Sequence, residues 1–516
     1  MAEWLPQGHL VWFVLDVVEQ VDTAVFHGRH PRSGPGRRAY DPDMLLALLL
    51  YSYAVGQRSS RRIGALCETD VAFRVLCAQD GPDHSTIARF RSVHEDAFAE
   101  VFAQVLVLCA EAGMGRVGIV SIDGTKIAAN ASLGANRGEK WLREQAREQA
   151  AEIVAEIVAE AAAIDAAEDE EYGDRRGDEL PPKFADRSGR RERIRKALDE
   201  IGKQTEQAER DDAADRARAE DYLRRVEASA EAGGTVMGKP PAGTDPVRLH
   251  RARLARARAR LEAAVPKTEA HKTARRHIRG AQRDLEAAEA AAAAGTVDLE
   301  GAAARKRRRH AAGADPAPAA NTSDPDSRTM STRSGGFIQG FNAQLAVTDD
   351  HLILATALTQ DTNDYNAFEP LMNAARAATD SIGHLTSTSG GIGIILADAG
   401  YLTEDNLTIE GPDRLIATGK HHALSRDARD HPTQEPPPPG ATALERMRHR
   451  LRTPEGHATY KRRSATVETV IGHLKDQTGL RRFSRRGLTA ATSELNLAAA
   501  VINLLKLRNH TLQPAT

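Results

Sequence analysis

Short runs of β-branched and other apolar residues, which alternate with helical segments, constrain the fold of this chain more than any other feature. The run GIVSID ends at Asp123, and the run GIGIIL leads to Asp398. Between them, FIQGFNAQLAV and HLILATALTQ flank Asp349 and Asp350 and predict an antiparallel hairpin. A further run, DRLIATG, predicts another strand. The order strand, hairpin, helix, strand, helix, strand and helix indicates an α/β fold with a mixed sheet flanked by helices.

The residues before this series, 1–115, predict an all-α N-terminal domain. Apolar residues recur with helical periodicity in three segments, 11–18, 44–55 and 98–110. Asp83 offers a cap for a helix expected over residues 86–94, whose polar side carries Arg89 and Arg91. This pattern suits a DNA-binding domain and a helical bundle that only packs on the core equally well.

A long charged segment interrupts the series after the first strand. Residues 140–320 are rich in Ala, Glu, Arg and Asp, which include strong helix formers. Leu254, Leu261 and Val265 recur at seven- and four-residue steps. The segment therefore predicts long helices in an antiparallel hairpin or coiled coil. The pattern does not indicate whether this insertion binds DNA, dimerises or only extends the fold.

The chain is long enough for several domains, since 516 residues can build two or three of them. We expect the helical N-terminal domain (1–115), a first part of the α/β core (116–139), the insertion (140–320), the rest of the core (321–510) and a short tail (511–516). The net charge of −2 does not indicate a polyanionic partner. Basic residues do cluster on both sides of Glu468, although such runs are more often solvated faces than binding sites.

The cysteines and the longest apolar stretch indicate the compartment. Cys67, Cys77 and Cys109 lie in apolar helical segments without CxxC spacing, which favours buried thiols in a reducing compartment over disulfides or a zinc site. The longest apolar stretch, Met44 to Val55, is about twelve residues and too short to cross a bilayer. No signal peptide precedes it. The sequence therefore predicts a cytoplasmic protein without a membrane partner.

Three acidic residues stand in settings that suit a metal site. Asp123 and Asp398 each end a predicted strand, and Glu468 lies in a strongly periodic helix. Each signal alone has a simpler reading, as a turn after a strand or as a solvated helix face. Together, carboxylates from separate elements suit a pair of Mg2+ ions about 3.5–4 Å apart. Two further acids, Asp361 and Asp364, lie near a strand end, where we expect helix capping.

Helical geometry relates Glu468 to Lys475. The two residues are seven positions apart, which at about 3.6 residues per turn places them within roughly 20° of each other around the helix. Val467, Val470 and Leu474 form the opposing apolar stripe. This arrangement suits a metal ligand beside a phosphate contact, and it also suits ordinary surface charge.

Several motifs follow one another along the chain: YDPDMLLALLLYSYAVGQRSSRRI, PDHSTIARFR, SIDGTKIAANAS, DPDSRTMSTRSGGFIQGFNAQLAV, LADAGYL and LRTPEGHATYKRRSATVETVIGHLK. In this order they resemble the DDE transposases of bacterial insertion sequences, in the branch with an InsH-type N-terminal domain. The resemblance implies an RNase H-like catalytic core with a mixed five-stranded sheet and an N-terminal domain that binds DNA. The segment 141–320 carries none of the family's motifs.

The resemblance also implies an activity and its metal. A DDE transposase binds the terminal inverted repeats of its element, cleaves DNA phosphodiesters and transfers the 3′-hydroxyl ends to target DNA. Asp123, Asp398 and Glu468 match the family's catalytic, metal-binding triad. The match implies two Mg2+ ions, for which Mn2+ is expected to substitute.

The match around Glu468 implies DNA contacts for Tyr460, Arg463 and Lys475, and Arg89 and Arg91 are further candidates. It also implies a homodimer in the synaptic complex and association with the nucleoid when bound to DNA. Two alternatives stay open. One is an RNase H-like, metal-dependent nuclease without strand transfer, and the other is a non-catalytic DNA-binding protein derived from a transposase.

Overall fold

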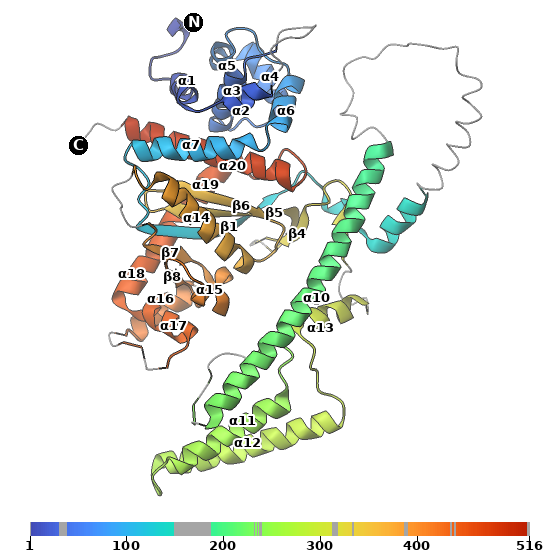
Figure 1. Ribbon diagram of the computed structural model, residues 1–516, viewed down its shortest axis with the longest axis vertical. Coiled ribbons are helices and arrows are strands. Elements are labelled where there is room, and N and C mark those ends of the chain that lie inside the picture. The colour runs from blue at the N-terminus through green and yellow to red at the C-terminus, as the bar shows by residue number, and fades with distance from the viewer. Residues whose placement is uncertain are drawn as a thin grey trace. The chain divides into compact units, whose positions relative to one another are not determined.

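The computed structural model describes residues 2–29, 39–148, 187–231, 233–234, 236, 240–311, 318–332, 335–385, 391–419, 421–433, 436–437 and 440–512. These residues divide into two compact units (Figure 1). Unit 1 comprises Met1–Ala135 and Ser323–Thr516, and unit 2 comprises Asn136–Thr322.

The N-terminal part of unit 1 is helical, in agreement with its periodicity. Its elements are η1 (Ala2–Trp4), α1 (Leu10–Gln20), α2 (Ala24–Gly28), α3 (Pro42–Ala54), α4 (Ser60–Thr69), α5 (Val71–Leu76), α6 (His84–Val93) and α7 (Ala97–Glu111). Asp41, Asp70 and Asp83 cap α3, α5 and α6 by accepting hydrogen bonds from backbone N–H groups of the first turn. Helix α3 buries most of its side chains, which explains its nearly continuous apolar sequence.

A mixed six-stranded sheet forms the centre of unit 1. Its strands are β1 (Ile119–Ala128), β4 (Arg328–Ser331), β5 (Phe337–Thr348), β6 (Ile353–Thr359), β7 (Ile394–Ala397) and β8 (Asp413–Ile416). The strand order is β4-β5-β1-β7-β8, and β6 also pairs with β5. Strand β5 is antiparallel to β1 and β6, which confirms the predicted hairpin, whereas β7 is parallel to β1 and β8.

The sheet has one strand more than the five expected. Strand β4 pairs with residues 337–340 of β5, and β6 pairs with residues 342–347. Because β1 occupies the other edge of β5 over residues 340–348, β4 and β6 share one edge of the long β5 strand. Strands β4 and β6 therefore occupy one position in the order of the sheet.

Strand β1 continues five residues beyond Asp123, where the sequence predicted its end. The pairing with β5 runs on from Asp123↔Leu345 to Ala128↔Gly340. The pairing with β7 stops earlier, at Ser121↔Leu396. The Asp-Gly step is therefore not a turn, because β5 continues to provide hydrogen-bonding partners after β7 has ended.

Helices and short turns complete unit 1. They are η2 (Leu133–Ala135), η3 (Tyr365–Ala367), α14 (Phe368–Ile382), η4 (Ala399–Tyr401), α15 (Glu404–Thr408), α16 (His421–Asp430), α17 (Ala443–Arg452), α18 (Pro454–Arg463), the π-helical turn η5 (Ser464–Glu468), α19 (Thr469–Asp476) and α20 (Leu488–Thr511). Helix α20 lies beside α7 and packs on β6 (Figure 1). By length and hydropathy α20 could cross a membrane, but 78% of its apolar window is buried, as in the core helix of a soluble protein.

One cluster of buried apolar residues extends from α1 through the sheet to α20, so the N-terminal helices and the sheet share a core. The three cysteines belong to it. Cys67, Cys77 and Cys109 are buried, as their apolar helical segments predicted.

Unit 2 is built mainly from helices: α10 (Arg187–Glu231), α11 (Pro246–Glu262), α12 (Glu269–Ala293) and α13 (Ala302–Ala311). Strands β2 (Asn136–Gly138) and β3 (Ala319–Asn321) pair antiparallel, which joins the beginning of the unit to its end. Helices α11 and α12 pack side by side (Figure 1). Arg251 near the start of α11 pairs with Glu289 near the end of α12, which indicates that the two helices run antiparallel.

Candidate functional site

The parallel pairing of β1 with β7 brings Asp123 close to Asp398. Ser121 pairs with Leu396, and each acid lies two residues further along its chain. Asp123 is only 3% exposed. Asp398 is half-buried and caps η4, where its Oδ1 accepts a hydrogen bond from the Gly400 N–H at 2.8 Å. Burial is the main cause that raises the pKa of Asp123, the carboxylate of Asp398 adds to the rise, and the guanidinium of Arg463 opposes it.

The π-helical turn η5 brings Glu468 to the same side of its helix as Arg463. Residues five positions apart in an α-helix differ by about 140° around the axis, whereas a π-helical turn pairs positions i and i+5. Arg463 Nη2 lies 3.3 Å from Glu468 Oε1, and Arg463 Nη1 lies 3.2 Å from Asp123 Oδ2. The guanidinium of Arg463 therefore joins the carboxylates of Asp123 and Glu468. Periodicity had predicted an uninterrupted helix here, and the turn divides it into α18 and α19.

The side chain of Lys475 contacts strand β1, which carries Asp123. Thr125 follows Asp123 by two positions, so their side chains share one face of β1. Lys475 Nζ donates a hydrogen bond to Thr125 Oγ1. The Glu468 and Lys475 side chains thus both lie close to the segment of β1 that carries Asp123.

Tyr460 and Arg463, which the family motif places next to Glu468, are interior residues. Tyr460 is 6% exposed and packs with Leu396, Leu415 and Met447, so burial raises the pKa of its phenol. Burial alone lowers the pKa of Arg463, but the nearby Asp123, Tyr460 and Asp398 together raise it. Arg463 is therefore a firmly protonated cation at the centre of the acidic group.

The two arginines of α6, Arg89 and Arg91, differ in their exposure to solvent. Arg89 is exposed, whereas Arg91 is 4% exposed. Arg91 Nη2 donates to the Tyr53 hydroxyl at 2.8 Å and to Ser484 Oγ at 3.0 Å, and it lies 3.8 Å from Glu494 Oε1. Arg91 thus connects α6 to the segment before α20, and its guanidinium is not available as the surface contact that the sequence predicted. Residues two apart on a helix differ by about 200°, which explains the opposite environments.

Asp364 has a different role from the helix cap that the sequence predicted. Its side chain makes no capping hydrogen bond to η3. Instead, Asp364 Oδ1 accepts from Asn342 Nδ2 at 2.7 Å and from Gln344 Nε2 at 2.8 Å, both on β5. The Tyr401 hydroxyl donates to Gln344 Oε1. Two polar residues at alternate positions of a buried strand were the sequence signal that could have revealed this group. Asp361, the other predicted cap, is exposed and accepts a hydrogen bond from Asn366 Nδ2 at 3.3 Å.

The ligand atoms of Asp123, Asp398 and Glu468 do not all lie within 4.8 Å of one another. Within the described part of the chain, the group of His, Cys, Asp and Glu residues that meets this criterion is His27, Asp41 and Asp43. The guanidinium of Arg463 pairs with both Asp123 and Glu468.

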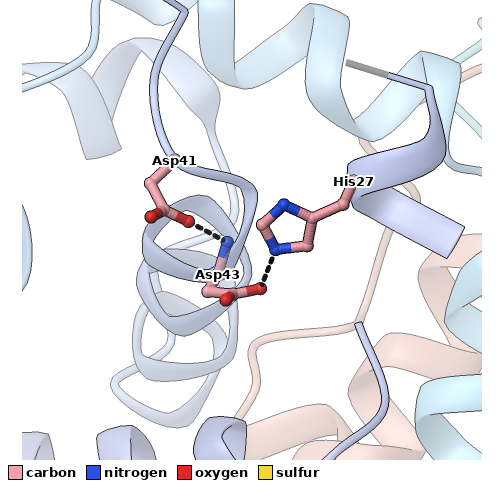
Figure 2. A group of neighbouring side chains, drawn as sticks. All are labelled: His27, Asp41 and Asp43. Carbon is pink, nitrogen blue, oxygen red and sulfur yellow. Dashed lines mark hydrogen bonds and ion pairs between the residues drawn. The ribbon is translucent and has the colours of Figure 1, made fainter. Parts of the chain in front are cut away.

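The His27 group has a structural explanation (Figure 2). Asp41 Oδ1 accepts from the Asp43 N–H at 2.8 Å and so caps α3, while His27 Nε2 lies 2.9 Å from Asp43 Oδ1. All three residues are at least partly exposed. Capping and an ion pair account for this group, and we assign no metal to it.

Comparison with known protein families found two matches. Residues 1–93 match a transposase domain (DUF772), and residues 432–508 match a transposase DDE domain. No curated protein and no solved structure matches the chain. The two ends of the chain therefore match transposase domains. Its resemblance to the DDE transposases of insertion sequences is confirmed, and the second match covers Glu468 with the Tyr460, Arg463 and Lys475 positions of the motif.

Proposed function

We propose that the chain is a DDE transposase that binds the terminal inverted repeats of its element, cleaves DNA phosphodiesters and transfers the 3′-hydroxyl ends to target DNA. The observation that carries the proposal is the convergence of Asp123 and Asp398 on paired strands, with Glu468 linked to Asp123 through Arg463. The sheet supports an RNase H-like core, since β1 is central, with an antiparallel hairpin on one side and two parallel strands on the other.

The donor set suits two divalent ions. Carboxylate oxygens are the ligands that Mg2+ prefers, and two ions about 3.5–4 Å apart do not require all three carboxylates to touch one another. Asp123, Asp398 and Glu468 would hold these ions through their carboxylates. When bound, Mg2+ or Mn2+ activates the attacking oxygen and stabilises the leaving oxygen.

The other residues of the motif and of helix α6 have proposed roles in neutralising the acids and binding DNA. Arg463 neutralises Asp123 and Glu468, and Tyr460 packs beside it in the interior. We propose that Lys475, beside Thr125, binds a phosphate next to the reacting bond, and that the exposed Arg89 contacts the DNA backbone at the terminal repeat. Synapsis of two identical ends favours a homodimer with two-fold symmetry on DNA.

The test is a set of charge-neutral variants. Asp123→Asn, Asp398→Asn and Glu468→Gln should each abolish cleavage of a terminal-repeat duplex in Mg2+, because each amide keeps the shape of the side chain but loses the charge that holds the ions. Repeat binding in a gel-shift assay should stay at the wild-type level. Asp361→Asn, a neutralised exposed acid outside the site, is the matched control and should cleave normally. Undiminished cleavage by any of the three variants contradicts the assignment.

The alternatives need a second assay. A metal-dependent nuclease would cut the repeat but would not join a pre-cleaved 3′-hydroxyl end to target DNA, whereas a transposase performs both reactions. A non-catalytic DNA-binding protein would perform neither. The presence of all three acids favours the transposase over the non-catalytic protein.

A further inference from the structure

Asp364 belongs to a hydrogen-bonded path that ends beside Asp398. Asp364 Oδ1 accepts from Asn342 Nδ2 and Gln344 Nε2, and Gln344 Oε1 accepts from the Tyr401 hydroxyl. Tyr401 lies in η4, the turn that Asp398 caps. The path therefore runs from the loop before η3, across strand β5, to the turn that carries one of the proposed metal ligands.

Two glycines show how closely Asp364 approaches both acid-bearing segments. A methyl group on Gly124, next to Asp123, would lie 2.6 Å from Asp364 Oδ1 and 2.5 Å from Gln344 Nε2. A methyl group on Gly400 would lie 3.0 Å from Asp364 Oδ2 and 2.9 Å from Asp398 Oδ1. Contacts this short are rare or unknown for a Cβ atom, so a side chain at either position would push these side-chain ends aside. Asp364 is thus packed against the backbone next to Asp123 and beside the carboxylate of Asp398.

The charge of Asp364 fixes the direction of every hydrogen bond in the path. Asn342, Gln344 and Tyr401 are fully or almost fully buried. An ionised carboxylate only accepts hydrogen bonds, so both amides must turn their NH2 groups toward Asp364. The oxygen of Gln344 then faces Tyr401 and can accept from its hydroxyl. A neutral side chain at position 364 would not impose this direction.

We propose that Asp364 is a positioning residue that holds Asp398 in place beside Asp123 for a divalent cation, through Gln344 and Tyr401. Asp364 does not itself contact the ion. The inference rests on the proposed function, since it takes Asp123 and Asp398 as metal ligands. Partners of this kind, which orient ligands without binding the metal, typically change metal affinity by about 10–100-fold when they are removed.

The experiment measures Mn2+ binding to the metal-free full-length protein by isothermal titration calorimetry, with Mn2+ itself as the probe. Asp364→Asn should weaken binding by about 10–100-fold. Asp361→Asn, three residues away and exposed, should bind like the wild type. Tyr401→Phe, which breaks the last link and leaves Asp364 in place, should also weaken binding. If Asp364 only stabilised the fold, its replacement would lower the melting temperature without changing the affinity of the folded protein, and that outcome overturns the proposal.

A reciprocal exchange tests the direction of the hydrogen bonds. Gln344→Glu alone places two carboxylates against each other and should weaken Mn2+ binding. In the double variant Asp364→Asn with Gln344→Glu, the new amide can donate to the new carboxylate, which can still accept from Tyr401. The double variant should therefore bind Mn2+ more tightly than either single variant. A double variant no better than the single ones overturns the proposed path.

The outcomes separate this inference from the proposed function. If the wild type does not bind Mn2+, or if Asp398→Asn binds as the wild type does, the metal site itself is wrong. If the wild type and Asp398→Asn behave as expected while Asp364→Asn retains full affinity, only the positioning role of Asp364 is wrong.

Discussion

Two ion pairs, one in each unit of the protein, differ in burial and in the sequence distance between their partners. In unit 1, Glu494 is completely buried and lies 2.6 Å from Arg58, a partner 436 positions away in the sequence. In unit 2, Glu206 and Arg210 are four positions apart on α10, their contact is 3.5 Å, and their side chains are 68% and 73% exposed. The Glu494 pair joins distant segments of the chain, whereas the Glu206 pair lies on the surface of a single helix. The comparison predicts very different costs when such charges are removed.

Glu494→Ala should produce the largest loss of stability. Glu494 accepts from Arg58, lies 3.8 Å from Arg91, and also accepts from the N–H and hydroxyl of Ser484. Removing one partner of a buried ion pair leaves uncompensated charge and typically costs about 3–5 kcal/mol. Denaturant unfolding measures the effect.

The matched control for this variant is Glu206→Ala in the exposed pair. If the two substitutions lowered the free energy of unfolding by similar amounts, the distinction between the buried and the exposed charges would be wrong. A useful companion is Glu494→Gln, which retains hydrogen bonding to Ser484 and should cost less than the alanine variant.

Local patterns in the sequence predicted the elements that depend on neighbouring residues. The N-terminal helices, the hairpin of β5 and β6, and strand β8 all form where periodicity and turn residues placed them. The expected proximity of Asp123 and Asp398 followed from strand order, and the parallel pairing of β1 with β7 agrees with it.

Long-range pairing explains what the sequence could not predict. Strand β1 passes beyond Asp123 because β5 accompanies it, and Asp364 binds β5 instead of capping a helix. A sequence pattern based on 3.6 residues per turn cannot predict the π-helical turn before Thr469. Arg91 was predicted to be a surface contact because it is charged, but its contacts with Glu494 and Ser484 keep it buried. In each case the deciding partner lies far away in the sequence or in a departure from regular geometry.

Asp123→Asn should have a smaller effect, and one of opposite sign, on the stability of the metal-free protein. Burial raises the pKa of Asp123 in the folded state above the unfolded value of about 3.9. A raised carboxyl pKa means that folding favours the protonated form of Asp123. The folded protein therefore loses stability as the pH rises from the unfolded-state pKa through the folded-state pKa. An amide at position 123 does not ionise, so the variant does not lose this stability. The variant should therefore melt at a higher temperature than the wild type at pH 7 in a chelator.

The difference in melting temperature should shrink as pH falls below about 3.9, where the wild-type carboxyl is protonated in both states. Added Mg2+ should stabilise the wild type and not the variant, since only the wild type retains the charge. A variant that melts below the wild type at neutral pH would indicate that Arg463 more than offsets the cost of burying Asp123.

The smallest effect is expected for Arg210→Ala in unit 2. Exposed ion pairs four positions apart on a helix contribute about 0.3–0.5 kcal/mol, because water screens the charges and two long side chains lose freedom when they pair. The contact of Arg210 with Glu206 is long at 3.5 Å, so we expect a change at or below this range. Denaturant unfolding at low and high salt measures it, and high salt should abolish the remaining difference. A loss above about 1 kcal/mol would exceed the range of exposed pairs and would show that Arg210, like the residues around Glu494, has a role beyond its own helix.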